Sequence, residues 1–218
     1  MIGGLANAQK ELCAYRLFGQ MLREGCDPTQ LTVLSILRAC SDRTVALELH
    51  HHMIERNFKE DTTTGSALMN MYMKCGEPQA ACKVFDMLPN RNVTTWTTMI
   101  SGLSRYSGHQ TFIHYFHNMQ QEGCLPDEVT FSCILSACSS MGLVDQGWIH
   151  FNSITQKHGL STTMEHCNHM VDILGRAGFL SDAKDLLVTF PLESNTVGWT
   201  LLIQHCRMHG NVAFEGIA

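Results

Sequence analysis

Apolar residues recur along this chain at steps of three and four positions, and short polar or glycine-containing segments separate the runs. The spacing is clearest in two neighbouring sets, Trp96, Met99, Ile100 and Leu103, then Phe112, Phe116 and Met119. Such steps place the residues on one face of an α-helix. An alternation with a period of two, which would indicate strands, is not sustained anywhere. The pattern therefore predicts pairs of amphipathic helices.

The chain also repeats itself at an offset of 98 residues. Laying 1–41 over 99–139 without gaps gives 16 identities in 41 positions. The identities lie mainly at apolar and turn positions, among them Gly25 with Gly123 and Pro28 with Pro126. Self-similarity at a fixed period is the signature of repeat architectures.

Each period divides into three shorter units that end in glycine or proline turns. Segment 122–126 illustrates such an end, because Gly123 terminates a helix and Pro126 cannot continue it. A helix-turn-helix hairpin cannot bury its apolar face alone, so we expect the hairpins to stack into an all-α solenoid. The predicted units are 1–29 (truncated), 30–61, 62–92, 93–127, 128–163, 164–195 and 196–218 (the start of a further segment).

Composition narrows the function classes. A hydrophobic content of 44% over 218 residues is enough to bury a core. The formal net charge of −5 excludes a strongly basic nucleic-acid-binding arm. No apolar run reaches the roughly 18 residues of a membrane span, and the first residues show neither a secretory signal nor a transit peptide. We therefore expect no contact with a membrane and no transit peptide in this chain.

The ten cysteines are predicted to be reduced thiols, because the chain is far longer than the small secreted domains that depend on disulfides. Cys40, Cys138 and Cys206 share the eleventh position of their units, and Cys26 shares another position with Cys124. This recurrence predicts small core residues that repeat with the fold.

Several segments closely resemble plant pentatricopeptide repeat (PPR) proteins. They are 67–76 (ALMNMYMKCG), 81–89 (ACKVFDMLP), 93–102 (VTTWTTMISG), 126–131 (PDEVTF) and 170–178 (MVDILGRAG). The Trp-x-x-Leu-Gly-x-x-Tyr signature of tetratricopeptide repeats, which have a similar period, is missing. The resemblance implies a tetratricopeptide-like superhelix of stacked hairpins.

The unit lengths resemble the PPR subclass in which pure, long and short repeats alternate. By this comparison 93–127 is pure, 30–61 and 128–163 are long, and 62–92 and 164–195 are short. Segments 196–202 and 206–212 are similar to the start of the C-terminal E extension of that subclass. Because Met1 falls in the middle of a first helix, we expect a C-terminal piece of a longer protein.

The family reads one RNA base per repeat with two side chains, the fifth residue and the last. The resemblance assigns this role to Ser66 with Asn92, Thr97 with Asp127, Ser132 with Thr163, and Asn168 with Asn195. By the family's code the first pair favours adenine, the second guanine and the fourth a pyrimidine. The predicted preference is 5′-A-G-N-Y-3′, with the RNA running parallel to the protein.

Two observations keep alternatives open at these positions. Leu34, the fifth residue of 30–61, can form no hydrogen bond beside Asp61, so this long repeat is expected only to space its neighbours. Asn92 and Asn195 also sit between helices, where small amides commonly form turns and caps. On that interpretation they would have a structural role alone.

The resemblance also implies contacts to the faces of the bases and to the phosphates. Stacking is assigned to second-position residues, namely Thr63, Thr94 and Val129; Leu31 and Val197 also suit this role, whereas the carboxylate Glu165 does not. The cations Lys74, Arg105 and Arg176 share the thirteenth position and are predicted to contact phosphates. The alternative is that they are solvated charges that favour helix C-termini.

The sequence carries no convincing motif of an enzyme, a metal site or a cofactor site. Cytosine deamination needs a His-x-Glu and a Cys-x-x-Cys around zinc, and neither motif occurs. His50-His51-His52 and the pair His205 and His209 lack four ligands at a convincing spacing. No glycine-rich phosphate loop is present. We expect no enzyme activity, no metal and no cofactor in this chain.

The sequence therefore predicts a non-catalytic specificity factor that binds single-stranded organellar RNA and takes no small-molecule substrate. The resemblance implies C-to-U RNA editing in a mitochondrion, which is favoured, or a chloroplast, with a deaminase or another editing-complex protein acting in trans. Two alternatives stay open. The chain could be a peptide-binding helical scaffold, or a truncated fragment without function.

Overall fold

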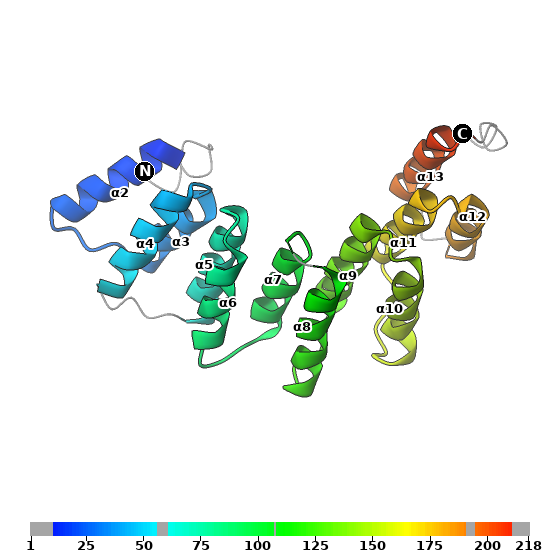
Figure 1. The fold of residues 1–218 in the computed structure, drawn as a ribbon, viewed down its shortest axis with the longest axis horizontal. Coiled ribbons are helices and arrows are strands. Elements are labelled where there is room, and N and C mark those ends of the chain that lie inside the picture. Colours follow the sequence, from blue (N-terminus) through cyan, green and yellow to red (C-terminus); the bar gives the residue numbers. More distant parts are fainter. Residues whose placement is uncertain (1–10, 56–60, 107, 191–194, 211–218) are drawn as a thin grey trace. The chain divides into compact units, whose positions relative to one another are not determined.

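The computed structural model describes residues 11–55, 61–106, 108–190 and 195–210. These residues form twelve α-helices and no strand (Figure 1), which confirms the all-α helical-repeat prediction. Residues 1–10 and 211–218, the outer parts of the first and last predicted units, lie outside the described residues. The helices are α2 (Glu11–Arg23), α3 (Gln30–Ala39), α4 (Arg43–Glu55), α5 (Thr62–Lys74), α6 (Pro78–Met87), α7 (Val93–Leu103), α8 (His109–Gln121), α9 (Glu128–Met141), α10 (Val144–Gln156), α11 (Met164–Arg176), α12 (Leu180–Thr189) and α13 (Thr196–Met208).

The chain divides into two compact units, Met1–Ser107 and Gly108–Ala218. The first contains α2 to α7 and the second α8 to α13. The predicted hairpin 93–127 is divided between them, because α7 belongs to the first unit and α8 to the second.

Six helices, called the first helices below, begin at the first residue of a predicted repeat: α3, α5, α7, α9, α11 and α13. A polar residue directly before each of them accepts a hydrogen bond from the backbone N–H three residues further on. These N-caps are Thr29, Asp61, Asn92, Asp127, Thr163 and Asn195. An N-cap satisfies one of the N–H groups that the first turn leaves unpaired, which explains why the helices start at these residues.

Glycines end several of the helices. Gly142 caps α9 with a left-handed backbone (φ 67°), and Gly123 has a φ of 75° just after α8. Residues other than glycine adopt these backbone angles at an energetic cost, so the turns between helices depend on glycine.

In the first unit, α5 packs against α3, α6 and α7. Trp96 from α7 is buried and meets the ring of Phe85 from α6 edge-on, with ring centroids 4.7 Å apart. Gly65 allows α5 to approach the end of α6, because a Cβ at that position would lie 2.5 Å from Leu88 Cδ2. Leu68 and Met99 complete this core without exposed surface. Full burial of each large apolar side chain stabilises the unit by about 1.5–3 kcal/mol.

In the second unit, α11 packs against α9, α12 and α13, and α9 also packs against α10. Phe131 of α9 is fully buried and lies edge-on to Phe116 of α8, with centroids 5.8 Å apart. Ile173 and Leu174 fill the space around α11. Each unit thus has its own core, in which first helices pack against successive first helices.

All ten cysteines are free thiols. Cys40, Cys138 and Cys206 are buried, as their recurrence predicts, and burial raises the pKa of Cys138 to about 12. The core prediction is wrong for Cys26, which is exposed because it lies in the turn after α2, and Cys124 is only half-buried. Among the described residues, no helix is long and apolar enough to cross a membrane.

Candidate nucleic-acid interface

The second residue of every first helix leaves its side chain exposed. In the first unit these residues are Leu31, Thr63 and Thr94, and in the second they are Val129, Glu165 and Val197. Val129 is 61% exposed and Leu31 is 74% exposed, although both are aliphatic. The three residues predicted to stack on bases, Thr63, Thr94 and Val129, are thus open to solvent within the first turn of their helices.

The fifth residues lie one turn further along and are less accessible. Ser66, Thr97 and Asn168 are half-buried, and Ser132 is only 6% exposed. The Ser66 hydroxyl donates a hydrogen bond to the carbonyl of Thr62 at 2.7 Å. Its proton is therefore used within the helix, and the lone pairs of its oxygen remain for an outside donor.

The last residues of the repeats are the N-caps described above. Asn92 and Asp127 are exposed, Thr163 is half-buried, and Asn195 is only 6% exposed. Both Asn92 and Asn195 do cap a helix, because Oδ1 of each accepts a backbone hydrogen bond from the residue three positions further on. At Asn92 only Oδ1 is used in the cap, so the amide Nδ2 is available to donate elsewhere.

A cavity in the first unit collects one complete set of predicted positions. It has a volume of about 270 Å³ and lies along α5, between α3 and the start of α7. Thr63 and Thr94 (second positions), Ser66 (fifth) and Asn92 (last) all line it. Its other walls come from Arg38, Thr62, Ala67, Asn70 and Thr98.

The second unit contains two further predicted pairs, and the first is Ser132 with Thr163. Thr163 forms a cap with His166: Thr163 Oγ1 accepts a hydrogen bond from the His166 backbone, while His166 Nδ1 accepts one from the Thr163 backbone. His166 Nε2 lies 2.8 Å from the carbonyl of Glu128, which fixes the tautomer with hydrogen on Nε2. The third-position histidine is an inter-helix contact that repeat counting does not suggest.

Asn168 and Asn195, the other pair, both approach Gly198. A Cβ on Gly198 would be 2.8 Å from both Asn168 Oδ1 and Asn195 Nδ2. Both of these atoms are buried and without a hydrogen-bond partner. Thr97 and Asp127, the remaining pair, belong to different units; Thr97 is half-buried and Asp127 is exposed.

The three predicted phosphate ligands are exposed, but two of them already have partners. Lys74 Nζ donates to the carbonyl of Arg38 at 3.0 Å, and Arg176 Nε donates to Asp172 Oδ2 at 2.9 Å. Arg105 follows the end of α7, and its side chain has no hydrogen-bond or ion-pair partner among the described residues. The helix-end interpretation therefore describes Lys74 and Arg176 more fully than it describes Arg105.

Asp172 joins three first helices of the second unit, which sequence spacing did not suggest. It accepts hydrogen bonds from Ser139 of α9 and Arg176 of α11, and its Oδ1 lies 2.9 Å from His205 Nε2 of α13. Burial acts to raise the pKa of Asp172. The hydrogen bonds from Ser139, Arg176 and His205 outweigh burial and hold that pKa below its usual range.

The histidines weighed as metal ligands have other partners. His205 pairs with Asp172, His209 Nε2 lies 2.8 Å from the carbonyl of Gly175, and His50 Nδ1 lies 2.6 Å from the Tyr72 hydroxyl. Within the described ranges no three His, Cys, Asp or Glu side chains come together in a way that could hold a metal ion.

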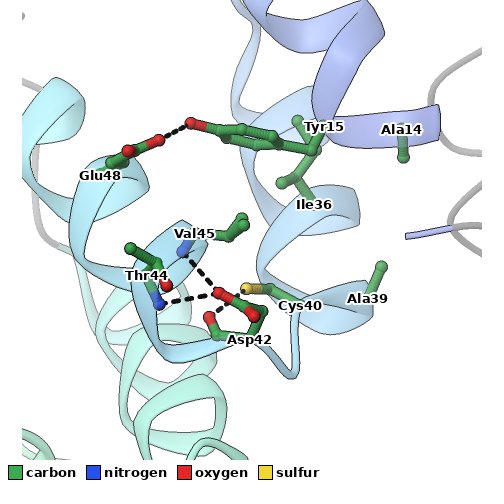
Figure 2. Close-up of a pocket in the computed structure, with 9 residues that line it drawn as sticks. All are labelled: Ala14, Tyr15, Ile36, Ala39, Cys40, Asp42, Thr44, Val45 and Glu48. Carbon is green, nitrogen blue, oxygen red and sulfur yellow. Dashed lines mark hydrogen bonds between the residues drawn. The ribbon is translucent and has the colours of Figure 1, made fainter. Parts of the chain in front are cut away.

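A larger hollow of about 470 Å³ lies among α2, α3 and α4 (Figure 2). Tyr15 donates a hydrogen bond to Glu48 across it, and burial together with this bond raises the pKa of Tyr15 to about 12. Asp42 accepts from the backbone N–H groups of Thr44 and Val45 at the start of α4. None of the predicted recognition residues lines this hollow.

Family models match three stretches of the chain. A model described as the PPR repeat family matches residues 91–140, and the PPR repeat model matches 66–93 and 165–188. The second of these stretches ends one residue after Asn92, the last residue of a predicted repeat.

Curated relatives from Arabidopsis thaliana align along nearly the whole chain. The mitochondrial pentatricopeptide repeat-containing protein At1g06140 is 36% identical over 99% of this chain and 39% of its own length. The pentatricopeptide repeat-containing protein At4g16470 is 38% identical over 100% of this chain and 44% of its own length. The chloroplastic protein At3g49170 is 38% identical over 78% of this chain and 20% of its own. The chain thus spans less than half the length of these relatives.

Solved structures share the fold. The pentatricopeptide repeat protein PPR10, in complex with an 18-nt psaJ RNA element, aligns with 97% of this chain and 42% of its own at a TM-score of 0.59 and 17% identity. Nuclear proteinaceous RNase P 2 from A. thaliana aligns with 84% of this chain and 44% of its own at a TM-score of 0.58 and 12% identity. With the repeat matches and the relatives, this likeness leads to one conclusion: the chain belongs to the pentatricopeptide repeat family.

Proposed function

We propose that this chain binds single-stranded RNA sequence-specifically and acts as a non-catalytic specificity factor in organellar RNA processing. The observation that carries the proposal is the cavity along α5, where the second, fifth and last positions of a repeat meet. A structural role alone would not require polar groups with unused hydrogen-bonding capacity at an accessible hollow.

The hydrogen-bonding groups of this cavity match one edge of adenine. Ser66 Oγ donates within its helix and offers an acceptor, while Asn92 Oδ1 accepts within its cap and leaves Nδ2 as a donor. Adenine presents an amino donor beside a ring-nitrogen acceptor on its Watson–Crick edge. The exposed second-position residues Thr63 and Thr94 supply the surfaces between which a base can lie.

The other pairs extend the preferred sequence. Thr97 with Asp127 would favour guanine, Ser132 with Thr163 sets no fixed base, and Asn168 with Asn195 would favour a pyrimidine. The proposal is thus a preference for 5′-A-G-N-Y-3′. Because Asn195 is almost fully buried, reading by the last pair requires that pair to open towards the RNA.

Phosphate contacts supply a smaller share of the affinity. Arg105 is exposed at the thirteenth position, and Lys74 keeps two further N–H donors beyond its bond to Arg38. With a net charge of −5, base contacts have to contribute much of the binding free energy.

We further propose C-to-U editing in a mitochondrion or chloroplast as the process served. The names of the relatives, mitochondrial for At1g06140 and chloroplastic for At3g49170, support an organelle. Segment 196–218 would begin an E extension of the pure, long and short subclass. A deaminase or another editing-complex protein in trans would then perform the chemistry.

Selection of RNA by the purified chain from a random single-stranded pool tests this function. Enrichment of A-G-N-Y is the expected result, and Thr97→Asn should move the second base from guanine towards uracil. Enrichment of an unrelated sequence would overturn the assignment of the pairs. Retention of no RNA would overturn RNA binding itself and favour a peptide-binding scaffold.

A further inference from the structure

One of the residues that line the cavity along α5, Arg38, comes from repeat 30–61, which precedes the repeat of Ser66 and Asn92. This residue lies in the last turn of α3 and is exposed. Its carbonyl accepts the hydrogen bond from Lys74 Nζ at 3.0 Å, which ties the end of α3 to the end of α5. Arg38 lines the same cavity as Ser66 and Asn92.

Arg38 is the only charged residue among those that line the cavity. Its guanidinium has no hydrogen-bond or ion-pair partner in the described part of the chain. By contrast, the hydroxyls of Ser66 and Thr98 donate to carbonyls of their own helices, at 2.7 and 2.8 Å. The cavity therefore offers hydroxyl lone pairs and the amides of Asn70 and Asn92 for a base edge, together with an uncompensated positive charge.

We propose that Arg38 binds a phosphate that flanks the nucleotide whose base faces Ser66 and Asn92. The long repeat 30–61 then takes part in RNA binding through its ninth residue, although Leu34 cannot read a base. This inference rests on the proposed RNA-binding function. A guanidinium presents its N–H groups in a planar fork that pairs two phosphate oxygens at once, which suits Arg38 to this role.

The ninth position distinguishes this repeat boundary from the others. The corresponding residues of the later units are Asn70, Ser101, Ser136, Asp172 and Gln204, and none of them is a cation. The phosphate contact is therefore a local anchor beside a single recognition pair, and neutralising Arg38 affects one position of the RNA.

The experiment uses the whole chain and a synthetic single-stranded RNA in which A-G-C-U is flanked by cytidines. Binding is followed by fluorescence anisotropy across a series of salt concentrations for wild type, Arg38→Gln, Arg38→Lys and Lys83→Gln. Lys83, exposed on α6 and outside the cavity, is the control for the loss of one positive charge. Urea unfolding of each variant separates binding effects from loss of fold.

A second RNA carries uncharged methylphosphonates at the two linkages that flank the adenosine. Both RNAs have 2′-deoxyribose at these linkages, so they differ only in the charge of the two phosphates. Arg38→Gln is expected to weaken binding about three- to ten-fold and to reduce the slope of log K against log salt by about 0.7, the value for one single-strand phosphate contact. Arg38→Lys keeps most of the slope. The uncharged linkages weaken wild type but leave Arg38→Gln nearly unchanged.

The results that overturn the inference differ from those that overturn the function. If wild type binds the RNA but Arg38→Gln behaves as Lys83→Gln does, Arg38 makes no phosphate contact. If Arg38→Lys is as weak as Arg38→Gln while the uncharged linkages have no effect, Arg38 contacts a base edge instead and the phosphate role is wrong. If wild type fails to bind the RNA, both the proposed function and this inference fail.

Discussion

Asn92 and Thr95 cap one another: Asn92 Oδ1 accepts a hydrogen bond from the Thr95 backbone at 3.0 Å, and Thr95 Oγ1 accepts one from the Asn92 backbone at 2.9 Å. The same arrangement joins Asp127 with Thr130. The residue predicted to recognise a base thus also holds the start of the next helix. The proposed base recognition and the observed cap use different atoms of one side chain, so substitution can separate them.

Asn92→Asp should keep the cap and change the base. A carboxylate oxygen accepts from Thr95 as the amide oxygen does, so the free energy of unfolding should change by less than about 0.5 kcal/mol. The loss of the Nδ2 donor should move the preference at this position from adenine towards guanine, which offers donors to a carboxylate. Urea unfolding and binding to RNAs that differ in this one base measure the two effects.

Asn92→Ala is the matched comparison. It removes the cap and should cost about 1 kcal/mol of stability while also weakening the choice of base. An Asn92→Asp variant that is as unstable as Asn92→Ala would show that the amide has a structural function beyond the cap.

Gly175→Ala should destabilise the second unit. A Cβ there would lie 2.2 Å from Cδ2 of His205, whose ring is held by Asp172, so the ring and its hydrogen bond have to shift. Overpacking of this kind costs about 1–3 kcal/mol. Gly19→Ala in α2 is the control, since nothing lies within 4 Å of its added Cβ and alanine favours a helix. Thermal unfolding should show that Gly175→Ala is less stable than Gly19→Ala. Equal stability of the two variants would refute the close approach of α11 and α13.

Asp172→Asn should cost about 2 kcal/mol, because a charged acceptor of three hydrogen bonds between helices is replaced by a neutral amide. Arg176→Gln removes only the partner that is 54% exposed and should cost less than about 1 kcal/mol. Denaturant unfolding at neutral pH compares them. If both variants lose the same stability, the charge of Asp172 adds nothing to its bonds with Ser139 and His205.

The stability of the second unit should fall as the pH drops below neutrality. Burial is the main cause that lowers the pKa of His150 to about 4, and the neighbouring His117 and Lys157 add to it. The unfolded chain then binds a proton near the ordinary pKa of 6.5, while the folded chain binds it only near 4. Stability is therefore full above pH 6.5 and is lost towards pH 4, by about 2 kcal/mol between pH 7.5 and 5.

His150→Phe provides the comparison for this pH effect, because its ring can keep the edge contact with Phe116. Unfolding by urea at several pH values should give a flatter profile for the variant than for wild type. A profile as steep as that of wild type would assign the pH dependence to other groups.

The parts of the fold that depend on local sequence were predictable. Apolar spacing, capping residues such as Asp61 and turn glycines such as Gly123 act within a few positions, so the helix starts follow from the sequence. The cluster around Asp172 was not predictable, because Ser139 and His205 each lie 33 positions away and meet it only through the stacking of helices. The burial of Asn195 likewise depends on a neighbouring helix and not on its own position in the repeat.

The candidate site was partly predictable for the same reason. Family positions identified Ser66 and Asn92, and the structure places both in one cavity. Arg38 was not among the predicted residues, because it belongs to the preceding repeat and reaches the cavity across the boundary between two helices. A rule that counts positions within one repeat misses a residue that lines the cavity of the next repeat.

The use of N-cap residues at the last position has an evolutionary consequence. Asp, Asn, Ser and Thr all cap helices well, and they differ in the hydrogen-bonding groups that they present outwards. If the last residue reads a base as proposed, point mutations among these four alter the RNA sequence that a repeat prefers while the helix start is preserved. Such a protein can move between targets through folded intermediates, one repeat at a time.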